Sequence, residues 1–245
     1  MKTIVIAAGY ATRLYPLTKN FPKPLLEIGD NTILGRMLDD IDTIPGIDSH
    51  IIVTNHKFAG IFEGWKNKTR YTRPITIIDD GTETNETRLG AVKDLLLAID
   101  KCGIDDDILV VAADNILDFS FKGFVGFSKE KGTSVIMCHY EPELKKLQRT
   151  GVIAVDGDMR VLEMQEKPER PVSNWAVPPF YIYRKEDLPL IKDCMAHGCG
   201  FDAPGNLAHY LCGVTDIHAY KMPGKRFDIG SLDSYEEAKK MFAEQ

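Results

Sequence analysis

Two cations, Arg13 and Lys23, follow a short apolar run at the start of the chain, in a loop that also contains Gly9 and three prolines. Small residues let a backbone approach a phosphate closely and direct its N–H groups at the anion, and fixed cations nearby supply opposite charge. This loop is therefore predicted to bind a polyphosphate. It is neither a P-loop, because no Gly-Lys-Ser/Thr follows, nor a GxGxxG dinucleotide turn. The alternative is a proline-stiffened surface loop whose two charges are solvated.

A pair of aspartates marks a second candidate site. Asp114 ends the apolar run at residues 108–113, and Asp228 follows a short apolar stretch near the other end of the chain. An unpaired carboxylate would be costly inside the core, so both side chains are predicted to face a cleft. Mg²⁺ binds one or two carboxylates together with substrate phosphates, so the pair is predicted to hold nucleotide-bound Mg²⁺. The alternative is that each aspartate caps a turn or a helix.

Lys167 is the third candidate, and it precedes Pro168. A proline restricts the residue before it to extended backbone, which would suit a lysine directed at a phosphate. A lone lysine is otherwise most often a solvated surface charge, and that is the alternative for Lys167.

The elements expected to position these residues alternate between strands and helices. Strands are predicted at residues 3–8, 49–54, 74–79, 108–113, 133–140, 151–155, 175–183 and 216–221, and helices at 32–44, 58–68 and 89–100. This alternation predicts right-handed βαβ units and a mostly parallel sheet. Ligands of open α/β sheets bind outside the carboxyl ends of the strands. Arg13, Asp80 and Asp114 each follow such an end, so they are expected to converge on one cleft.

The chain changes character after about residue 130, where strands and short loops predominate. This part is predicted to be an antiparallel extension of the sheet. The last helix is predicted at 234–243, with Asp233 and Glu236 forming a start signal of the capping-box type. The sequence contains no linker and no internal repeat, so residues 1–245 are predicted to form a single domain.

The bulk composition excludes several function classes. The net charge of −6 over 245 residues argues against a nucleic-acid partner, because surfaces that bind nucleic acid usually carry a basic excess. No apolar run is long enough to span a membrane, and no signal-peptide core precedes the first strand, so neither a membrane partner nor export is expected. Five cysteines without the spacing of a disulfide framework indicate reduced thiols and a cytoplasmic protein.

Four segments of the chain, in order, resemble the sugar-phosphate nucleotidylyltransferases. The run IAAGYATRLYPLTKNFPKPLLEI at residues 6–28 resembles the N-terminal signature of that family, G-x-G-T-R-L-x-P…P-K-P-L. Residues 113–116 and 227–230 resemble its G-D-N-I metal segment and its C-terminal D-x-G segment. Residues 166–177 resemble glucose-1-phosphate thymidylyltransferases in particular. The resemblance covers nearly the whole chain.

This resemblance implies a fold, an activity and a cofactor. The fold is a Rossmann-like, three-layer α/β nucleotidyltransferase fold with a mostly parallel mixed sheet and a small antiparallel acceptor-binding extension. The activity is Mg²⁺-dependent in-line transfer from a nucleoside triphosphate, dTTP or UTP, to a hexose 1-phosphate, which yields an NDP-sugar and pyrophosphate. A sugar 1-phosphate is already anionic near neutral pH, because its second pKa is about 6, so no general base is needed. The expected partners are these two substrates, and an oligomer is compatible with the sequence.

The resemblance also implies the site residues, position by position. Arg13 would bind the β- and γ-phosphates, Lys23 the α-phosphate and Lys167 the attacking phosphate. The nucleotide would also contact Ala8, Gly9, Thr12, Asp80, Leu89 and Gly90. The sugar would contact Asn115, Gly151, Glu166, Lys167, Val177 and Tyr181, and for Tyr181 a place in the core is the alternative. Asp114 and Asp228 would hold the Mg²⁺.

The sequence departs from the family pattern at two places that bear on substrate choice. Ala11 stands where the signature has its second glycine, and an alanine would shift or strain the loop if that glycine has a positive φ. Thr87 replaces a glycine that would touch the base or the sugar, and the bulky Arg88 follows it. A purine would be crowded by this segment, so pyrimidine nucleotides are favoured.

Three other functions compete with this prediction. The first is a cytidylyl- or uridylyltransferase for another phosphorylated acceptor, such as an amino sugar, a heptose or phosphocholine. The second is a GT-A glycosyltransferase with a DxD motif, but the acidic run at residues 105–107 precedes its strand rather than following it. The third is a non-catalytic relative that binds a nucleotide sugar, because Ala11 and Thr87 replace family glycines.

Overall fold

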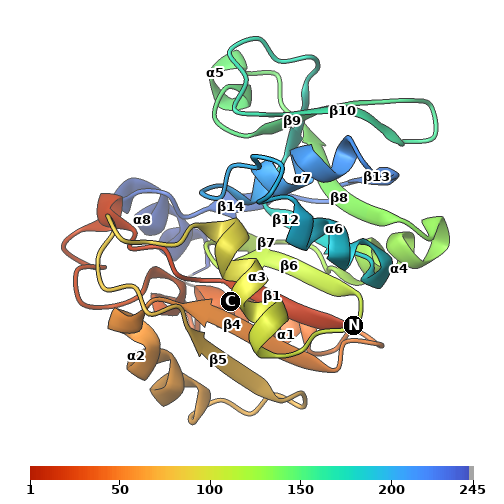
Figure 1. Ribbon diagram of the computed structural model, residues 1–245. Coiled ribbons are helices and arrows are strands. Elements are labelled where there is room, and N and C mark those ends of the chain that lie inside the picture. Colours follow the sequence, from red (N-terminus) through yellow and green to blue (C-terminus); the bar gives the residue numbers. More distant parts are fainter. Residues whose placement is uncertain (243–245) are drawn as a thin grey trace. The chain divides into compact units, whose positions relative to one another are not determined.

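A computed structural model describes residues 1–242, in which the chain forms two compact units. Unit 1 combines three segments of the chain, namely residues 1–88, residues 112–122 and the residues from 224 onward. Unit 2 comprises residues 89–111 and 123–223. Figure 1 labels the helices and strands of both units.

Unit 1 is built on a parallel sheet with the strand order β1–β4–β5. These strands are β1 (Lys2–Ile6), β4 (Ser49–Thr54) and β5 (Ile75–Asp79), and the helices that follow in this unit are α1 (Ile33–Ile41) and α2 (His56–Lys66). The apolar, β-branched residues of β1 and β4 are buried, as is typical of parallel strands covered on both faces. Asn55 caps α2 by accepting a hydrogen bond from Phe58 N, and α2 packs on β4 and β5 (Figure 1).

Two short antiparallel pairs complete unit 1. They join β2 (Glu27–Ile28) to β3 (Asn31–Thr32) and β7 (Asn115–Leu117) to β14 (Arg226–Asp228). The register of the second pair places Asn115 opposite Asp228. The sequence predicted neither pair, because strands this short carry no clear period.

Helix α8 (Leu232–Met241) follows β14 and begins two residues before its predicted start. Its N-cap is Ser231, whose hydroxyl accepts from Ser234 N while the Ser234 hydroxyl accepts from Ser231 N. The capping box predicted at Asp233 and Glu236 is therefore wrong, because serine side chains one turn apart fill both places. The predicted end of this helix, Ala243, lies outside the described residues.

A buried aspartate links distant parts of unit 1. Asp42 accepts hydrogen bonds from Thr72 N and Thr72 Oγ1, both at 2.8 Å, and from Arg73 N at 3.0 Å, and its Oδ1 lies 3.1 Å from His50 Nε2. Burial acts to raise the pKa of Asp42, but these hydrogen bonds outweigh it and lower the pKa to about 2. Asp42 therefore joins the end of α1 to β4 and to the segment before β5.

Unit 2 is largely antiparallel, with the strand order β10–β9–β11–β8–β12–β6 and with β13 parallel to β8. Its strands are β6 (Ile108–Ala112), β8 (Ser134–Tyr140), β9 (Gly151–Val155), β10 (Val161–Glu166), β11 (Trp175–Val177), β12 (Phe180–Tyr183) and β13 (Ile217–Lys221). The antiparallel extension predicted from the sequence is confirmed. The predicted strand at 175–183 is divided in two, because Pro178 and Pro179 cannot donate to the ladder.

The helices beyond β5 differ in how well the sequence predicted them. They are α3 (Ala91–Lys101), α4 (Lys122–Lys131), α5 (Leu144–Leu147), α6 (Leu188–Asp193) and α7 (Pro204–Cys212). Helix α3 was predicted two residues early, whereas α4 and α6 were not predicted. Helix α7 packs on β10 and on α3 within unit 2. Among residues 1–242, no helix is long and apolar enough to cross a membrane.

Candidate nucleotide and metal site

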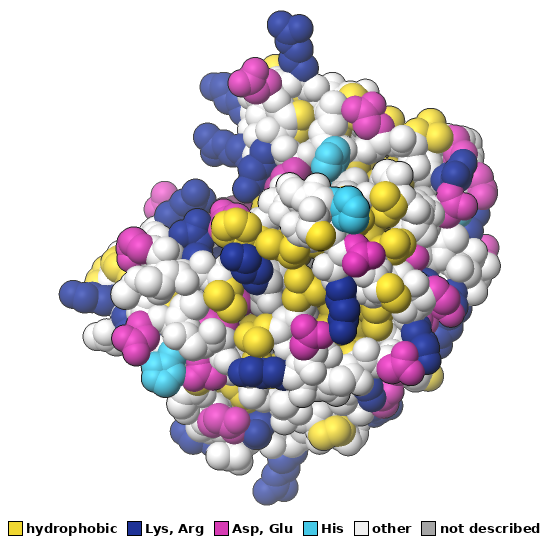
Figure 2. All heavy atoms as spheres, viewed as in Figure 1, with side chains coloured by type: hydrophobic (Ala, Val, Ile, Leu, Met, Phe, Trp, Pro, Cys, Tyr) yellow, Lys and Arg dark blue, Asp and Glu magenta, His cyan; other side chains and the backbone are white. Residues whose placement is uncertain are grey.

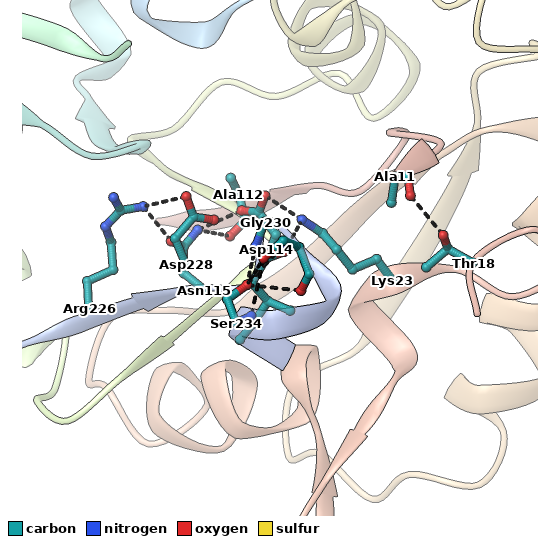
Figure 3. Close-up of polar contacts among 12 residues, drawn as sticks. Ala11, Thr18, Lys23, Ala112, Asp114, Asn115, Arg226, Asp228, Gly230 and Ser234 are labelled. Carbon is teal, nitrogen blue, oxygen red and sulfur yellow. Dashed lines mark hydrogen bonds and ion pairs between the residues drawn. The ribbon is translucent and has the colours of Figure 1, made fainter. Parts of the chain in front are cut away.

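Asp114 and Asp228 lie in the same part of unit 1 (Figure 3). Asp114 stands between β6 and β7, and Asp228 is the last residue of β14. Lys23 Nζ is 2.8 Å from Asp114 Oδ2 and 2.8 Å from the carbonyl oxygen of Ile229. Ile229 N in turn donates to the carbonyl oxygen of Asp114 at 3.0 Å. The contacts of Lys23, Asp114 and Ile229 therefore join the three segments of unit 1 beside the two carboxylates.

The two carboxylates influence each other electrostatically. Partial burial and the nearby charge of Asp114 raise the pKa of Asp228, while the cations Arg226, Lys23 and Arg13 act to lower it. The Asp228 side chain is nevertheless 55% exposed. Two acidic groups that repel each other at an accessible position have the chemistry of a divalent cation site.

The donor set fits Mg²⁺. A carboxylate offers about four lone-pair positions, and Asp114 accepts side-chain hydrogen bonds only from Lys23 and Asn115 within the described part of the chain. That part contains no group of three or more His, Cys, Asp or Glu side chains arranged to hold a metal. Mg²⁺ needs only one or two carboxylates when phosphates and water supply the other ligands, so this pair is sufficient.

A pocket of about 310 Å³ lies beside Asp114. It is lined by Ile6, Ala7, Gly9, Ala11, Lys23, Pro24, Ala112, Ala113 and Asp114. A Cβ atom at Gly9 would have no neighbour within 4 Å, so protein packing does not require a glycine there. The space that Gly9 leaves open is therefore available to a ligand. The structure thus brings together Gly9, Lys23 and Asp114 from the predicted site.

Ala11 adopts the left-handed backbone conformation, with φ 47° and ψ 44°. This conformation costs an L-residue about 1–2 kcal/mol. The carbonyl oxygen of Ala11 accepts hydrogen bonds from Thr18 Oγ1 at 2.8 Å and from Leu14 N at 3.0 Å, which hold it in place (Figure 3). The alanine therefore holds a strained backbone conformation in this loop.

The other residues of unit 1 that the sequence assigns to the nucleotide are Ala8, Thr12, Arg13 and Asp80. Ala8 is buried, and its carbonyl oxygen accepts from Asn55 Nδ2 at 3.0 Å. Thr12 and Arg13 are exposed in a 3₁₀ turn at Thr12–Leu14. Asp80 follows β5, as predicted, and its Oδ1 accepts from Thr82 N at 2.7 Å within a turn. Thr12, Arg13 and Asp80 do not line the pocket beside Asp114.

Three of the predicted sugar residues gather within unit 2. A Cβ atom at Gly151 would lie 3.2 Å from Val177 Cβ and 3.3 Å from Glu166 Oε2. A Cβ atom at Gly205 would lie only 1.9 Å from Glu166 Oε2, so the carboxylate fills the space beside this glycine at the start of α7. Burial raises the pKa of Glu166, and the charges of Lys167 and His209 act to lower it. Glycines on two elements therefore make room for one carboxylate.

Lys167 does not have the extended backbone that its proline neighbour led us to expect. Its φ is 50°, so that prediction is wrong, and Lys167 N donates to the Thr150 carbonyl oxygen at 3.0 Å. This hydrogen bond continues the pairing of β9 with β10 beyond the end of β10 and turns the chain at Lys167. The Lys167 side chain is 54% exposed, and its Nζ lies 3.8 Å from Glu166 Oε1.

The remaining predicted residues of unit 2 have mainly packing contacts. Gly90 has φ 93°, and a Cβ atom there would lie 2.5 Å from the Phe201 carbonyl oxygen. Leu89, next to it, is partly buried. Tyr181 is buried in β12, and its ring is stacked on that of Tyr183 with the centroids 5.8 Å apart. The structure thus places Tyr181 among core aromatics.

The part of unit 2 formed by α5 and the β9–β10 hairpin carries exposed charges of both signs. Figure 2 shows Lys and Arg side chains projecting over these elements. The exposed cations in and beside this segment are Lys145, Lys146, Arg149, Arg160, Lys167 and Arg170, and the exposed acids are Glu143, Asp156, Asp158, Glu163 and Glu169. Lys146 is paired with Glu143 at 2.6 Å.

Sequence reasoning missed two residues that touch the candidate site. Arg226 Nη1 donates to Asn115 Oδ1 at 2.7 Å and lies 4.0 Å from Asp228 Oδ2. Ser234 Oγ accepts from Gly230 N at 3.1 Å and so fixes the backbone just after Asp228. The sequence could have indicated Arg226, because a residue two positions before Asp228 on a strand points to the same face as Asp228.

Comparisons with known proteins give consistent relatives. A family model described as nucleotidyl transferase matches residues 2–245. The chain is 27% identical to a UTP–glucose-1-phosphate uridylyltransferase of Haloferax volcanii, over 100% of this chain and 98% of that protein. It is 25% identical to a glucose-1-phosphate adenylyltransferase of Fervidobacterium nodosum, over 96% of this chain but only 59% of that protein. A solved structure of UDP-glucose pyrophosphorylase complexed with UDP-glucose matches 98% of this chain and 97% of its own with a TM-score of 0.82 at 22% identity. This similarity confirms the predicted α/β fold with a mixed central sheet.

Proposed function

Because the chain belongs to the nucleotidyl transferase family, we propose that it transfers a nucleotidyl group from a nucleoside triphosphate to a sugar 1-phosphate and releases pyrophosphate. The favoured substrates are dTTP or UTP and a hexose 1-phosphate. The observation that carries this proposal is the cluster of Asp114, Asp228 and Lys23 beside the open space at Gly9. That cluster provides a divalent cation site and a lysine next to a pocket that can admit phosphates.

The nucleotide is assigned to the residues of unit 1. Arg13 binds the β- and γ-phosphates that leave as pyrophosphate, and Lys23 binds the α-phosphate. Asp114 and Asp228 would hold Mg²⁺, which neutralises phosphate charge during the transfer. Lys23 donates hydrogen bonds to Asp114 and to the Ile229 carbonyl oxygen, so the direction of its side chain is fixed before the nucleotide binds. Such preorganised charges stabilise the transition state without reorganisation.

The acceptor is assigned to the residues of unit 2. Lys167, whose ammonium is exposed, binds the attacking phosphate, and Glu166 accepts hydrogen bonds from sugar hydroxyls. A sugar phosphate with a second pKa of about 6 is an anionic nucleophile near neutral pH, so the chain needs no general base. The work of the protein is to align the two substrates and to balance their charge.

The nucleotide preference rests on residues 82–88. Thr87 Oγ1 lies in a turn with the Thr84 carbonyl oxygen at 3.1 Å, and Arg88 Nη1 donates to the Asn85 carbonyl oxygen at 2.9 Å. These exposed side chains would crowd a purine more than a pyrimidine. Thymidine and uridine differ by a methyl group and a 2′-hydroxyl, and a methyl alone gives only about 1–3 kcal/mol of discrimination, so dTTP and UTP are expected to be used within roughly 200-fold of each other. The relatives act on different nucleotides, so this choice has to be measured.

The decisive experiment measures pyrophosphate release over a matrix of nucleoside triphosphates and phosphorylated acceptors with Mg²⁺. Release with dTTP or UTP and a hexose 1-phosphate supports the proposal. Release only with CTP, or only with an amino sugar, heptose or choline phosphate, would identify a different acceptor or base. Nucleotide-sugar binding with no release would identify a non-catalytic relative. Release only with ATP or GTP would refute the role given to Thr87 and Arg88. We further propose a cytoplasmic location, where nucleoside triphosphates are available.

A further inference from the structure

We infer that Asn115 and Arg226 are positioning residues for the carboxylate pair, and that they act through a chain of hydrogen bonds from Arg226 to Asn115 to Asp114. This inference rests on the proposed function, because the pair is assigned there to Mg²⁺. It changes the role predicted for Asn115, which the resemblance assigned to the sugar. All the residues in this series of hydrogen bonds belong to unit 1 (Figure 3).

Both the nitrogen and the oxygen of the Asn115 side chain form hydrogen bonds within the protein. Asn115 is 0% exposed, and its Nδ2 donates to Asp114 Oδ1 at 2.7 Å and to the Ala112 carbonyl oxygen at 3.4 Å. Its Oδ1 accepts from Arg226 Nη1 at 2.7 Å. A sugar hydroxyl would have to displace one of these partners, and a buried polar group that loses its partner costs about 1–3 kcal/mol. Asn115 is therefore better suited to orient Asp114 than to touch a substrate.

Arg226 determines which way the Asn115 amide points. An amide rotated by half a turn would place its oxygen against the carboxylate of Asp114 and its NH₂ against the guanidinium of Arg226. Both contacts would then pair like with like, acceptor against acceptor and donor against donor. Arg226 thus fixes the donor end of Asn115 toward Asp114, and Lys23 holds the other oxygen of the same carboxylate.

The same guanidinium also faces the second carboxylate. Arg226 and Asp228 are two residues apart on β14, so their side chains share one face of the strand. Arg226 Nη1 lies 4.0 Å from Asp228 Oδ2, and the register of β14 with β7 sets Asp228 opposite Asn115. Arg226 therefore lies beside Asp228 directly and is linked to Asp114 through Asn115.

Electrostatics alone gives the opposite expectation for Arg226. A fixed positive charge this close to a divalent cation site repels the cation, so removing it should tighten metal binding. If Arg226 is present to orient the carboxylates, its removal should weaken metal binding in spite of the lost repulsion. The direction of the change distinguishes the two roles. Partners of this kind, one shell out from a metal, typically contribute about 10–100-fold to metal affinity.

The test measures Mn²⁺ affinity of the full chain, without substrates, by electron paramagnetic resonance, alongside pyrophosphate release. Arg226→Met and Asn115→Leu are each expected to weaken Mn²⁺ binding about tenfold. The double variant should be little worse than either single variant, because both break one chain of contacts. Lys225→Met removes an exposed cation of the neighbouring residue and should leave the affinity unchanged. Asp114→Asn marks the loss of a direct ligand.

Several outcomes would overturn the inference. Mn²⁺ binding that is unchanged or tighter in Arg226→Met would show that Arg226 acts only as a charge. If that variant does not fold, Arg226→Lys keeps the charge but lacks the planar guanidinium, and wild-type Mn²⁺ affinity in it would also refute the positioning role. Wild-type protein that neither binds Mn²⁺ nor releases pyrophosphate would refute the proposed function and this inference together. Wild-type protein that does both, with Asn115→Leu unaffected, would refute this inference alone.

Discussion

Lys23 and Asp114 form an ion pair, with Nζ 2.8 Å from Oδ2, although they are far apart in the sequence. The lysine side chain is only 12% exposed, so its charge depends on this partner and on the Ile229 carbonyl oxygen. The same carboxylate is proposed to hold Mg²⁺. Asp114 therefore stabilises the fold through Lys23 and serves the reaction through its charge.

Asp114→Asn should separate these two roles. The amide keeps an oxygen that accepts from Lys23, but its NH₂ then faces the NH₂ of Asn115, so the protein should stay folded with its free energy of unfolding lowered by about 1–3 kcal/mol. Turnover should fall by about 10²-fold or more, because a metal ligand and its charge are lost. Unfolding by urea and pyrophosphate release measure the two effects. Asp30→Asn removes an exposed carboxylate elsewhere in unit 1 and should change neither. Wild-type turnover in Asp114→Asn at saturating Mg²⁺ would remove Asp114 from the metal site.

Arg13→Ala and Lys167→Ala should affect different substrates. Each side chain is assigned to one phosphate group, and a charged hydrogen bond contributes about 1.5–3 kcal/mol, or about tenfold or more in binding. Arg13→Ala should therefore raise KM chiefly for the nucleotide, and Lys167→Ala chiefly for the sugar phosphate. Steady-state kinetics with each substrate varied in turn measures this, with Lys129→Ala on α4 as a control for loss of an exposed cation. If both variants raised KM for one substrate only, this division of roles would be wrong.

Gly9→Ala should impair the nucleotide site without harming the fold. Gly9 has no neighbour within 4 Å of a built Cβ and no positive φ. An added methyl should leave stability unchanged or raise it by about 0.4–1 kcal/mol, while it raises KM for the nucleotide. Gly90→Ala is the contrasting variant, because its φ of 93° and the Phe201 carbonyl oxygen at 2.5 Å should make it clearly destabilising. Unchanged nucleotide kinetics in Gly9→Ala would count against a phosphate at this loop.

Ala11→Gly should stabilise the protein, which reverses the usual effect of this substitution. Glycine relieves a left-handed conformation that costs about 1–2 kcal/mol, and it loses about 0.4–1 kcal/mol through the freer unfolded chain. The net gain should be about 0–1.6 kcal/mol in the free energy of unfolding measured in urea. The same change at Ala59, inside α2, should instead cost about 1 kcal/mol. Destabilisation by Ala11→Gly would show that the loop gains more from the alanine than its backbone angle suggests.

Asp42 should make unit 1 sensitive to acid. Its folded pKa of about 2 lies below its ordinary value of 3.8, so the folded state favours the ionised form. The resulting stability, about 2 kcal/mol, is present above pH 3.8 and is lost as the pH falls through about 2. Asp42→Asn should therefore be less stable than wild type at neutral pH, with the difference narrowing in acid. A difference that stays constant between neutral pH and pH 2 would contradict the role of Asp42.

The sequence predicted well what depends on local pattern. The strands at 49–54 and 151–155 have the predicted bounds, because β-branched apolar runs with clear ends specify buried strands. Pro178 and Pro179 could have indicated that the strand predicted at 175–183 is divided, but the apolar residues on both sides favoured one continuous strand. The β7–β14 pair was not readable, because its short strands gain their pairing only when distant segments meet.

The candidate site likewise contains residues that the sequence could predict and contacts that it could not. Asp114 and Lys23 could be predicted as charges placed next to a strand or a phosphate loop. The commitment of Asn115 to Asp114 and Arg226 could not, because an asparagine in a D-N pair looks equally suited to a ligand or to a network. The positive φ of Lys167 arose from a hydrogen bond to Thr150, a contact between strands that sequence spacing does not specify.

Unit 1 closes late when the chain is synthesised, because β14 and Asp228 belong to its last segment. At about 5–20 residues per second, a ribosome takes roughly 6–20 s to pass from Asp114 to Asp228. During that interval nearly all of unit 2 emerges, while the first carboxylate lacks its partner. A nascent chain that has not yet reached residue 228 therefore lacks the second of the two carboxylates proposed to hold Mg²⁺.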